Sequence, residues 1–102
     1  MPQVEINWVE GIEDDFELEK ELIKVKTRMT NLVSLNVSKH SDRVLGLPDN
    51  IRRVKFGQDR RLFILVDSIA EIIYCLAYLP RKTCYSKKSL NKVLSIVKEI
   101  SH

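Results

Sequence analysis

The sequence predicts an α+β fold in which helices pack on an antiparallel sheet. Three observations predict it: helical periodicity in the first third, three short apolar runs divided by turns, and an amphipathic C-terminal stretch. With 102 residues, 44% of them hydrophobic and 30% charged, the chain suits a single domain over residues 1–102. We expect a β-α-α-β-β-β-α order: an N-terminal strand and helical hairpin packed on the sheet, and a C-terminal helix.

The first element is a strand over residues 4–9, because Val4, Ile6 and Trp8 alternate onto one face. Helical spacing starts near Glu13, where acidic side chains crowd the first turn and favour the helix dipole. The apolar positions of this pattern are Phe16, Leu18, Leu22, Ile23, Val25, Met29, Leu32 and Val33. Polar residues at 27, 30 and 31 interrupt it, so one long helix and a helical hairpin reaching about Lys39 both remain open.

Residues 38–50 are rich in turn-forming residues and predict a loop. Three apolar runs follow, over 51–56, over 61–66, and from Ile69 or Glu71 to Leu79. The turns between them predict a meander of antiparallel strands. The third run is apolar on both faces, which predicts a central strand covered on both sides.

The last element is a helix that starts between Ser86 and Ser89, either of which can cap it. Its apolar stripe recurs at three- and four-residue spacing and comprises Leu90, Val93, Leu94, Val97 and Ile100. These elements predict one helical layer on one antiparallel sheet.

The net charge of +3 combines two regions of opposite sign. Residues 1–21 hold eight acidic side chains and one lysine, whereas residues 22–102 hold sixteen basic and six acidic ones. The basic region points to a polyanionic or acidic partner, although a solubilised surface with an acidic first helix explains the charges equally well.

Composition also excludes several classes of protein. Cys75 and Cys84 are too few for a disulfide framework and lack metal-ligand spacing, so we expect neither a metal nor another cofactor. No apolar run is long enough to span a membrane, and the N-terminus lacks a secretory pattern. We therefore expect a cytoplasmic protein with no membrane partner.

Basic residues gather on the predicted sheet. Strand alternation puts Arg53 and Lys55 on one face and Arg52 on the other. If the three strands are neighbours, one surface collects Arg53, Lys55, Arg61, Arg81, Lys82 and Tyr85. Such a surface suits an RNA strand, because the cations can bind its phosphates and the tyrosine ring can stack on a base.

Such a surface can also cleave RNA without a metal, because the ribose 2′-OH can attack its own phosphate. The reaction needs a base, cations for the developing charge, and an acid. Arginine suits the cation role, and lysine or tyrosine can exchange protons. The residues alone do not fix which group does which, and neither His40 nor His102 is well placed as the base.

Three segments, 45–56, 60–67 and 79–86, together resemble the RelE branch of the RelE/ParE toxin superfamily. The shared pattern is a basic strand, a strand opening with Arg, an apolar strand ending in Arg and Lys, and Tyr-Ser before a helix. The resemblance covers about residues 45–97. Before residue 45 it rests only on the order of elements, a strand followed by two helices. The resemblance implies a ribosome-dependent, metal-independent endoribonuclease (an mRNA interferase) that cleaves messenger RNA in the A site, and a separate antitoxin chain as partner.

The resemblance also implies roles for individual residues. It assigns catalysis to Lys55, Arg61, Arg81 and Tyr85, with Arg61 on the scissile phosphate and Tyr85 stacking on a base. For contacts with RNA we expect the basic residues Arg52, Arg53, Arg60, Lys82, Lys87 and Lys88, although Lys87 and Lys88 suit a solvated helix face better than a specific site. Two features depart from the family pattern: the first helix is acidic rather than Lys-rich, and position 53 is an arginine, which is a poor general base.

Two other functions remain open. The second possible function is that of a catalytically silent RNA- or protein-binding module with the same fold. The acidic first helix favours this alternative. A ParE-like inhibitor of DNA gyrase is the third reading, and the basic residues together with Tyr85 argue against it.

Overall fold

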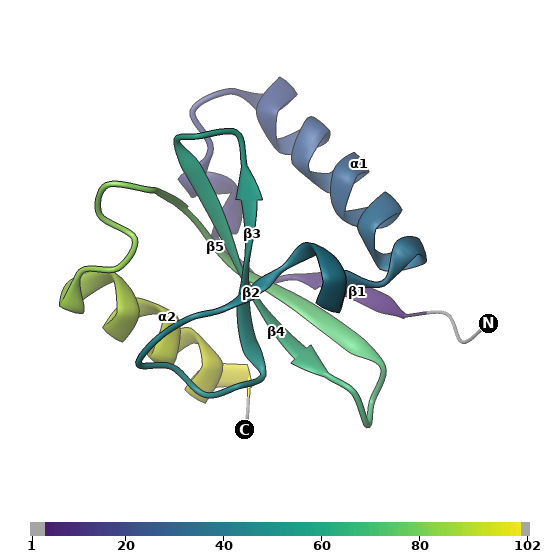
Figure 1. Cartoon of the computed structure of the whole chain (residues 1–102). Coiled ribbons are helices and arrows are strands. Elements are labelled where there is room, and N and C mark those ends of the chain that lie inside the picture. Colours follow the sequence, from purple (N-terminus) through teal and green to yellow (C-terminus); the bar gives the residue numbers. More distant parts are fainter. Residues whose placement is uncertain (1–3, 101–102) are drawn as a thin grey trace.

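The computed structural model describes residues 4–100, in which two α-helices flank a five-stranded mixed sheet (Figure 1). The strands are β1 (Glu5–Trp8), β2 (Asp42–Arg43), β3 (Ile51–Phe56), β4 (Arg60–Asp67) and β5 (Ile72–Pro80). The helices are α1 (Glu19–Leu35) and α2 (Lys87–Ile100), with short 3₁₀ helices η1 (Ile12–Asp15) and η2 (Val37–His40) before β2. The predicted α+β class is confirmed. Within residues 4–100, neither helix is both long and apolar enough to cross a membrane.

The strand order is β1-β5-β4-β3-β2. The predicted antiparallel meander of β3, β4 and β5 is confirmed. The first strand differs from the expectation, because β1 lies parallel to β5 and makes the sheet mixed. Alternation of side chains could place β1 in the sheet, but it carries no information on the direction of a strand relative to a neighbour about 65 residues away in sequence.

A β-bulge in β5 changes which side chains share a face. Phe63 pairs with Ala77 and Ile64 pairs with Cys75, so Leu76 is an extra residue opposite β4. Leu76 and Ala77 therefore both contribute to the cluster beneath α2. Strict alternation would put Leu76 and Ala77 on opposite faces, so the sequence pattern places the residues of β5 correctly only as far as Leu76.

The predicted helical hairpin is a single α-helix that ends before η2. Tertiary contacts delay its start: the Phe16 ring stacks on Tyr78 with centroids 4.3 Å apart, and the Asp15 carboxylate accepts a hydrogen bond from the Tyr78 backbone N–H at 2.9 Å. Because Phe16 and Leu18 are extended, the helical phase begins only at Glu19. As a result Ile23, expected inside, is 58% exposed, and the buried stripe of α1 is Val25, Met29 and Leu32.

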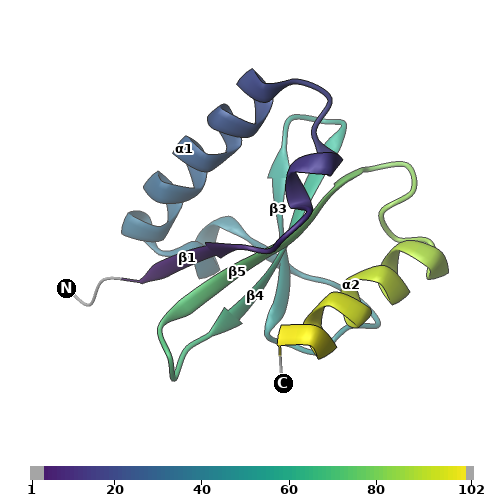
Figure 2. The same cartoon turned by 180° about the vertical axis from the view of Figure 1, so that it is seen from behind.

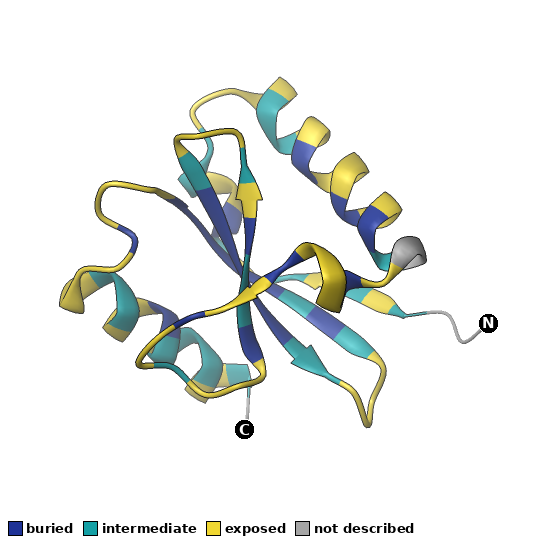
Figure 3. Ribbon diagram, in the orientation of Figure 1, coloured by how far each residue is buried: buried dark blue, intermediate teal, exposed yellow. Residues whose placement is uncertain are grey.

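Two apolar cores lie on opposite faces of the sheet, and each is closed by one helix (Figures 2 and 3). Beneath α1 the core contains Val25, Met29, Leu32, Val54, Leu62, Ile64, Ile73 and Cys75. Beneath α2 it contains Ile51, Phe63, Leu65, Leu76, Leu79 and Val93. The predicted coverage of β5 on both faces is confirmed, whereas the expected one helical layer is wrong, because strands apolar on both faces need cover on both.

Three buried groups make the fold sensitive to alkali. Burial raises the pKa of the Cys75 thiol to about 12, against the opposing charge of Lys26. Burial also raises the pKa of Tyr78, and the Glu21 carboxylate raises it further because it accepts a hydrogen bond from the phenol. Burial likewise raises the pKa of the Cys84 thiol, although the charges of nearby arginines oppose the rise. These groups keep their protons in the folded chain when the unfolded chain loses them.

We therefore expect the free energy of unfolding to fall as the pH rises from 8 to 10, because the unfolded chain then binds fewer protons. Cys75 alone contributes a loss of about 1 kcal/mol at pH 10. Urea unfolding at several pH values measures it. Cys75→Ala lowers stability at every pH but should flatten the decline, and an equally steep decline in that variant would contradict the assignment.

Candidate functional site

Three basic side chains share the α2-facing side of the sheet where β3 ends and β4 begins. Arg53 pairs across the strands with Phe63, which belongs to the core beneath α2. Lys55 pairs with Arg61, and Arg61 pairs with Leu79 of the same core. Paired residues point to the same side of a sheet. The structure thus brings Arg53, Lys55 and Arg61 together, as alternation predicts.

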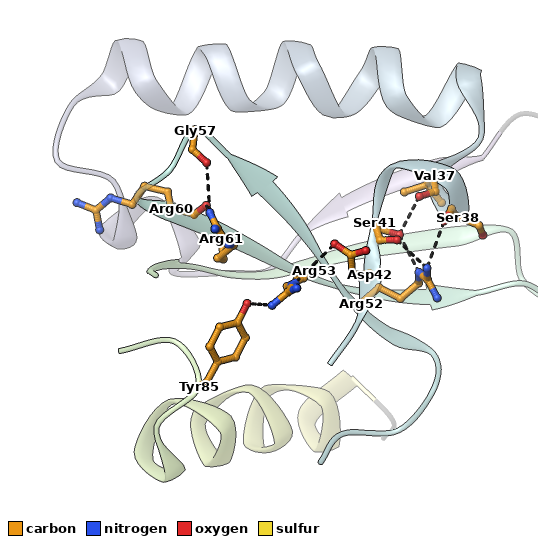
Figure 4. A network of polar contacts seen from close by, with 10 residues as sticks. All are labelled: Val37, Ser38, Ser41, Asp42, Arg52, Arg53, Gly57, Arg60, Arg61 and Tyr85. Atoms are coloured by element: carbon orange, nitrogen blue, oxygen red, sulfur yellow. Dashed lines mark hydrogen bonds and ion pairs between the residues drawn. The ribbon is translucent and has the colours of Figure 1, made fainter. Parts of the chain in front are cut away.

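Tyr85 is held against this face by Arg53 (Figure 4). The Arg53 guanidinium donates a hydrogen bond to the Tyr85 hydroxyl and lies 5.2 Å from the centroid of its ring. The Phe63 ring is 6.3 Å from the Tyr85 ring. Because the phenol oxygen accepts from Arg53, the phenol O–H remains available to donate to a ligand. Tyr85 is 40% exposed, so a ligand can reach it.

Arg61 is buried, with only 6% of its surface exposed. Its guanidinium donates to the carbonyl oxygens of Arg60 at 2.8 Å and Gly57 at 3.3 Å. Gly57 adopts a positive φ of 63° in the β3–β4 turn, a conformation that glycine adopts readily. Within residues 4–100 the Arg61 charge has no carboxylate partner, and its Nε has no hydrogen-bond partner. A buried cation in this state favours an anionic ligand.

The Cys84 thiol is buried in the segment that carries Arg81 and Tyr85. Burial raises the pKa of this thiol, and the charges of Arg61, Arg53 and Arg81 oppose that rise. Cys84 is fully buried, with Sγ 3.5 Å from the Arg81 carbonyl oxygen. It anchors the segment between β5 and α2 that carries Arg81 and Tyr85.

Arg81 and Lys82 line a cleft of about 450 Å³ beside the β3–β4 turn. The Arg81 backbone N–H donates to the Asp59 carbonyl at 2.7 Å, which ties the two loops together. Arg53 and Tyr85 do not line this cleft. Of the six residues expected to converge, Arg53, Lys55 and Tyr85 lie on the face with Arg61 buried beside them, and Arg81 and Lys82 line the cleft.

Three of the predicted RNA-binding residues lie away from both the face and the cleft, and the fourth, Arg60, lines the cleft from the opposite face. Arg52 points to the opposite face and donates to Ser41 Oγ and the Ser41 carbonyl, both at 2.7 Å (Figure 4). Arg60, also on that face, pairs with Glu17 at 3.4 Å. Lys87 and Lys88 are exposed in the first turn of α2.

Two contacts of acidic side chains were not predicted from the sequence. Asp42 lies next to the site, 3.7 Å from Arg53 Nε, and Asp15 lies 3.4 Å from Lys92 of α2, which is not one of the site residues. Asp42 belongs to the two-residue strand β2, within a stretch expected to be loop, so no periodic signal marked it. His40 is exposed in η2, and His102 lies outside the described residues.

Comparisons with known proteins give the fold. The structure is similar to that of an arginine-to-alanine double mutant of the E. coli toxin RelE in the free state, with a TM-score of 0.65 and 9% identity over 90% of this chain and 95% of that one. It is also similar to the conserved hypothetical protein HP0894 from Helicobacter pylori, with a TM-score of 0.54 and 14% identity over 78% of this chain and 97% of that one. No protein-family model and no curated protein sequence matches the chain. The chain has a RelE-like fold.

The buried charge of Arg61 predicts a stabilising substitution. Arg61→Met keeps the length of the side chain and removes an unpaired charge, so we expect the free energy of unfolding to rise by about 1 kcal/mol. Urea unfolding monitored by circular dichroism measures it.

Arg52→Met is the matched control, because the Arg52 guanidinium makes three hydrogen bonds to residues 38 and 41. Its loss should destabilise the fold by about 1–3 kcal/mol, since the buried Ser41 then lacks its partner. If Arg61→Met costs as much as Arg52→Met, Arg61 is a structural residue and not one held for an anion.

Proposed function

We propose that this chain is the toxin of a toxin–antitoxin system, a metal-independent endoribonuclease that acts in the cytoplasm on messenger RNA in the ribosomal A site. The observation that carries the proposal is the buried Arg61, which among the described residues has no carboxylate partner, beside Arg53, Lys55 and the tethered Tyr85. The RelE-like fold supports it. The antitoxin, a separate chain, is expected to cover this cationic face.

The proposed reaction is an internal transfer within RNA. The 2′-oxygen forms a bond to the adjacent phosphorus, the bond from phosphorus to the 5′-oxygen breaks, and the products are a 2′,3′-cyclic phosphate and a 5′-hydroxyl. Arg61 and Arg81 are assigned to the phosphate oxygens, where guanidinium groups stabilise the charge of the transition state.

Lys55 and Tyr85 are the side chains of the face whose chemical types exchange protons in catalysis, whereas a guanidinium does not. We assign to Lys55 the removal of the 2′-hydroxyl proton. Tyr85 donates a proton to the departing 5′-oxygen, a role that suits a phenol whose oxygen already accepts from Arg53.

The shape of the face explains the expected dependence on the ribosome. Arg53 and Tyr85 lie on an open surface, and nothing there fixes the RNA so that the 2′-oxygen and the 5′-oxygen stand in line. That alignment accounts for a large part of the rate in such reactions. A messenger RNA already held in the A site supplies it.

A catalytically silent RNA- or protein-binding module is the second candidate, and one contact favours it. Asp42 lies 3.7 Å from Arg53, and a carboxylate there competes with RNA phosphates. Arg53 also cannot act as a base.

The test of catalysis is cleavage of messenger RNA in a reconstituted translation system. The wild-type chain should cut translated messages within codons, and an Arg81→Ala/Tyr85→Phe double variant should cut them at least about 100-fold more slowly, because it lacks both a phosphate-binding cation and a proton donor. The matched control, Arg43→Ala/Tyr74→Phe, makes the same chemical changes outside the site and should cut normally.

Other outcomes would reject the proposal. Equal cutting by the double variant would place the active site elsewhere. Binding of wild-type chain to programmed ribosomes without cleavage would establish the silent module. DNA breaks with intact messages would establish a gyrase inhibitor.

Asp42 provides a second test. Asp42→Asn removes the carboxylate that competes for Arg53, so the affinity for single-stranded RNA should rise about two- to fivefold. Fluorescence anisotropy measures it. Asp49→Asn makes the same change at an exposed pair with Arg43, away from the site, and should leave affinity unchanged. Weaker binding by Asp42→Asn would mean that Asp42 positions Arg53 for the ligand.

A further inference from the structure

A second cleft lies on the other side of the β3–β4 turn from the Arg81–Lys82 cleft. It has a volume of about 560 Å³ and lies between α1 and the turn. Both clefts are lined by Gln58, Asp59 and Arg60, so they meet at the tip of the turn. Together they form a path from the segment that carries Tyr85 to the exposed flank of α1.

Cations line this path along its length. Lys24 and Arg28 of α1 stand at one end, Arg60 at the middle, and Arg81 and Lys82 at the other end. Two carboxylates, Glu21 and Asp59, also line it. Glu21 is engaged by the Tyr78 hydroxyl, from which it accepts a hydrogen bond. Positive charge therefore predominates.

In the cleft beneath α1 the Phe56 ring is half-buried, and the Tyr78 ring beside it is buried, with Phe16 stacked on it. The Arg28 guanidinium lies 5.6 Å from the Phe56 ring centroid, and the Phe56 and Tyr78 rings meet edge to face with centroids 5.9 Å apart. Guanidinium planes and rings are the surfaces on which unpaired bases stack. Cations beside such surfaces suit single-stranded nucleic acid better than an acidic peptide, which has no bases to stack.

We infer that this path is a second binding site for single-stranded RNA, in which nucleotides flanking the cleaved one pass Arg81 and Lys82, cross Arg60, and bind between α1 and the turn. The inference rests on the proposed function for the identity of the strand. Arg60 now pairs with Glu17, whose side chain is 80% exposed, at 3.4 Å. A contact so exposed to water is easily exchanged for a phosphate.

The experiment uses a fluorescein-labelled single-stranded RNA of twelve nucleotides, titrated with the full chain at several salt concentrations. Lys24→Gln/Arg28→Gln should weaken binding about five- to tenfold and reduce the salt slope by about 0.7 for each phosphate that the variant no longer neutralises. Lys26→Gln is the matched control, because Lys26 lies over Trp8, outside the cleft, and should change little.

A competition experiment separates RNA from an acidic protein segment as occupant. An unlabelled oligouridylate should displace the labelled RNA at least tenfold better than a glutamate peptide of equal charge. Equal competition by the peptide would overturn the inference in favour of an acidic partner, and so would unchanged binding by the Lys24→Gln/Arg28→Gln variant.

Failure of the inference and failure of the proposed function are distinguishable. If wild type cleaves messages and the double variant binds RNA normally, the path is wrong and the function stands. If wild type never cleaves but the double variant binds RNA more weakly than Lys26→Gln does, the function is wrong and the path stands.

Discussion

The fold depends on the burial of β4 on both faces. Residues 61–65 are all buried, and the side chains of this strand alternate between the core beneath α1 and the core beneath α2. A strand of this kind needs a neighbour on each edge and a helix on each face. β3 and β5 supply the edges, and α1 and α2 supply the faces. The ends of the strands are then the places where charged side chains can gather.

Arg61 shows the cost of this arrangement. It stands at the start of β4, where the register with Leu79 points its side chain into the edge of the core beneath α2. A leucine or methionine would suit such a position better, since a charge without a carboxylate partner is costly to bury. Carbonyl oxygens of Gly57 and Arg60 accept hydrogen bonds from part of the guanidinium, and Nε has no partner in the part of the chain that the structure describes. An arginine at such a place is what the proposed contact with a phosphate requires, since an anionic ligand would offset the cost of burying its charge.

Much of the fold and the placement of the basic residues on the sheet could be predicted from the sequence, because both follow from the short-range periodicity of apolar residues. Alternation in β3 placed Arg53 and Lys55 on one face, and the apolar run of β5 marked a strand covered twice. The errors arose where distant contacts decide. The Phe16–Tyr78 stack displaces the start of α1 and exposes Ile23, and Leu76 becomes a bulge only in relation to β4. The contact between Asp42 and Arg53 depends on the pairing of β2 with β3, and two residues leave no pattern to recognise.

The acidic N-terminal segment, which fitted an RNA-binding protein least, has a defined place in the structure. Asp15 accepts a hydrogen bond from the Tyr78 backbone N–H and lies near Lys92, and Glu17 pairs with Arg60. These carboxylates therefore border the basic end of the sheet instead of covering the face that carries Arg61 and Tyr85. Because these carboxylates are paired with Lys92 and Arg60, their negative charge is partly balanced where the two regions meet. The opposite signs of the two regions, separated in sequence, therefore meet as ion pairs at one edge of the structure and leave the face of Arg53, Lys55 and Arg61 cationic.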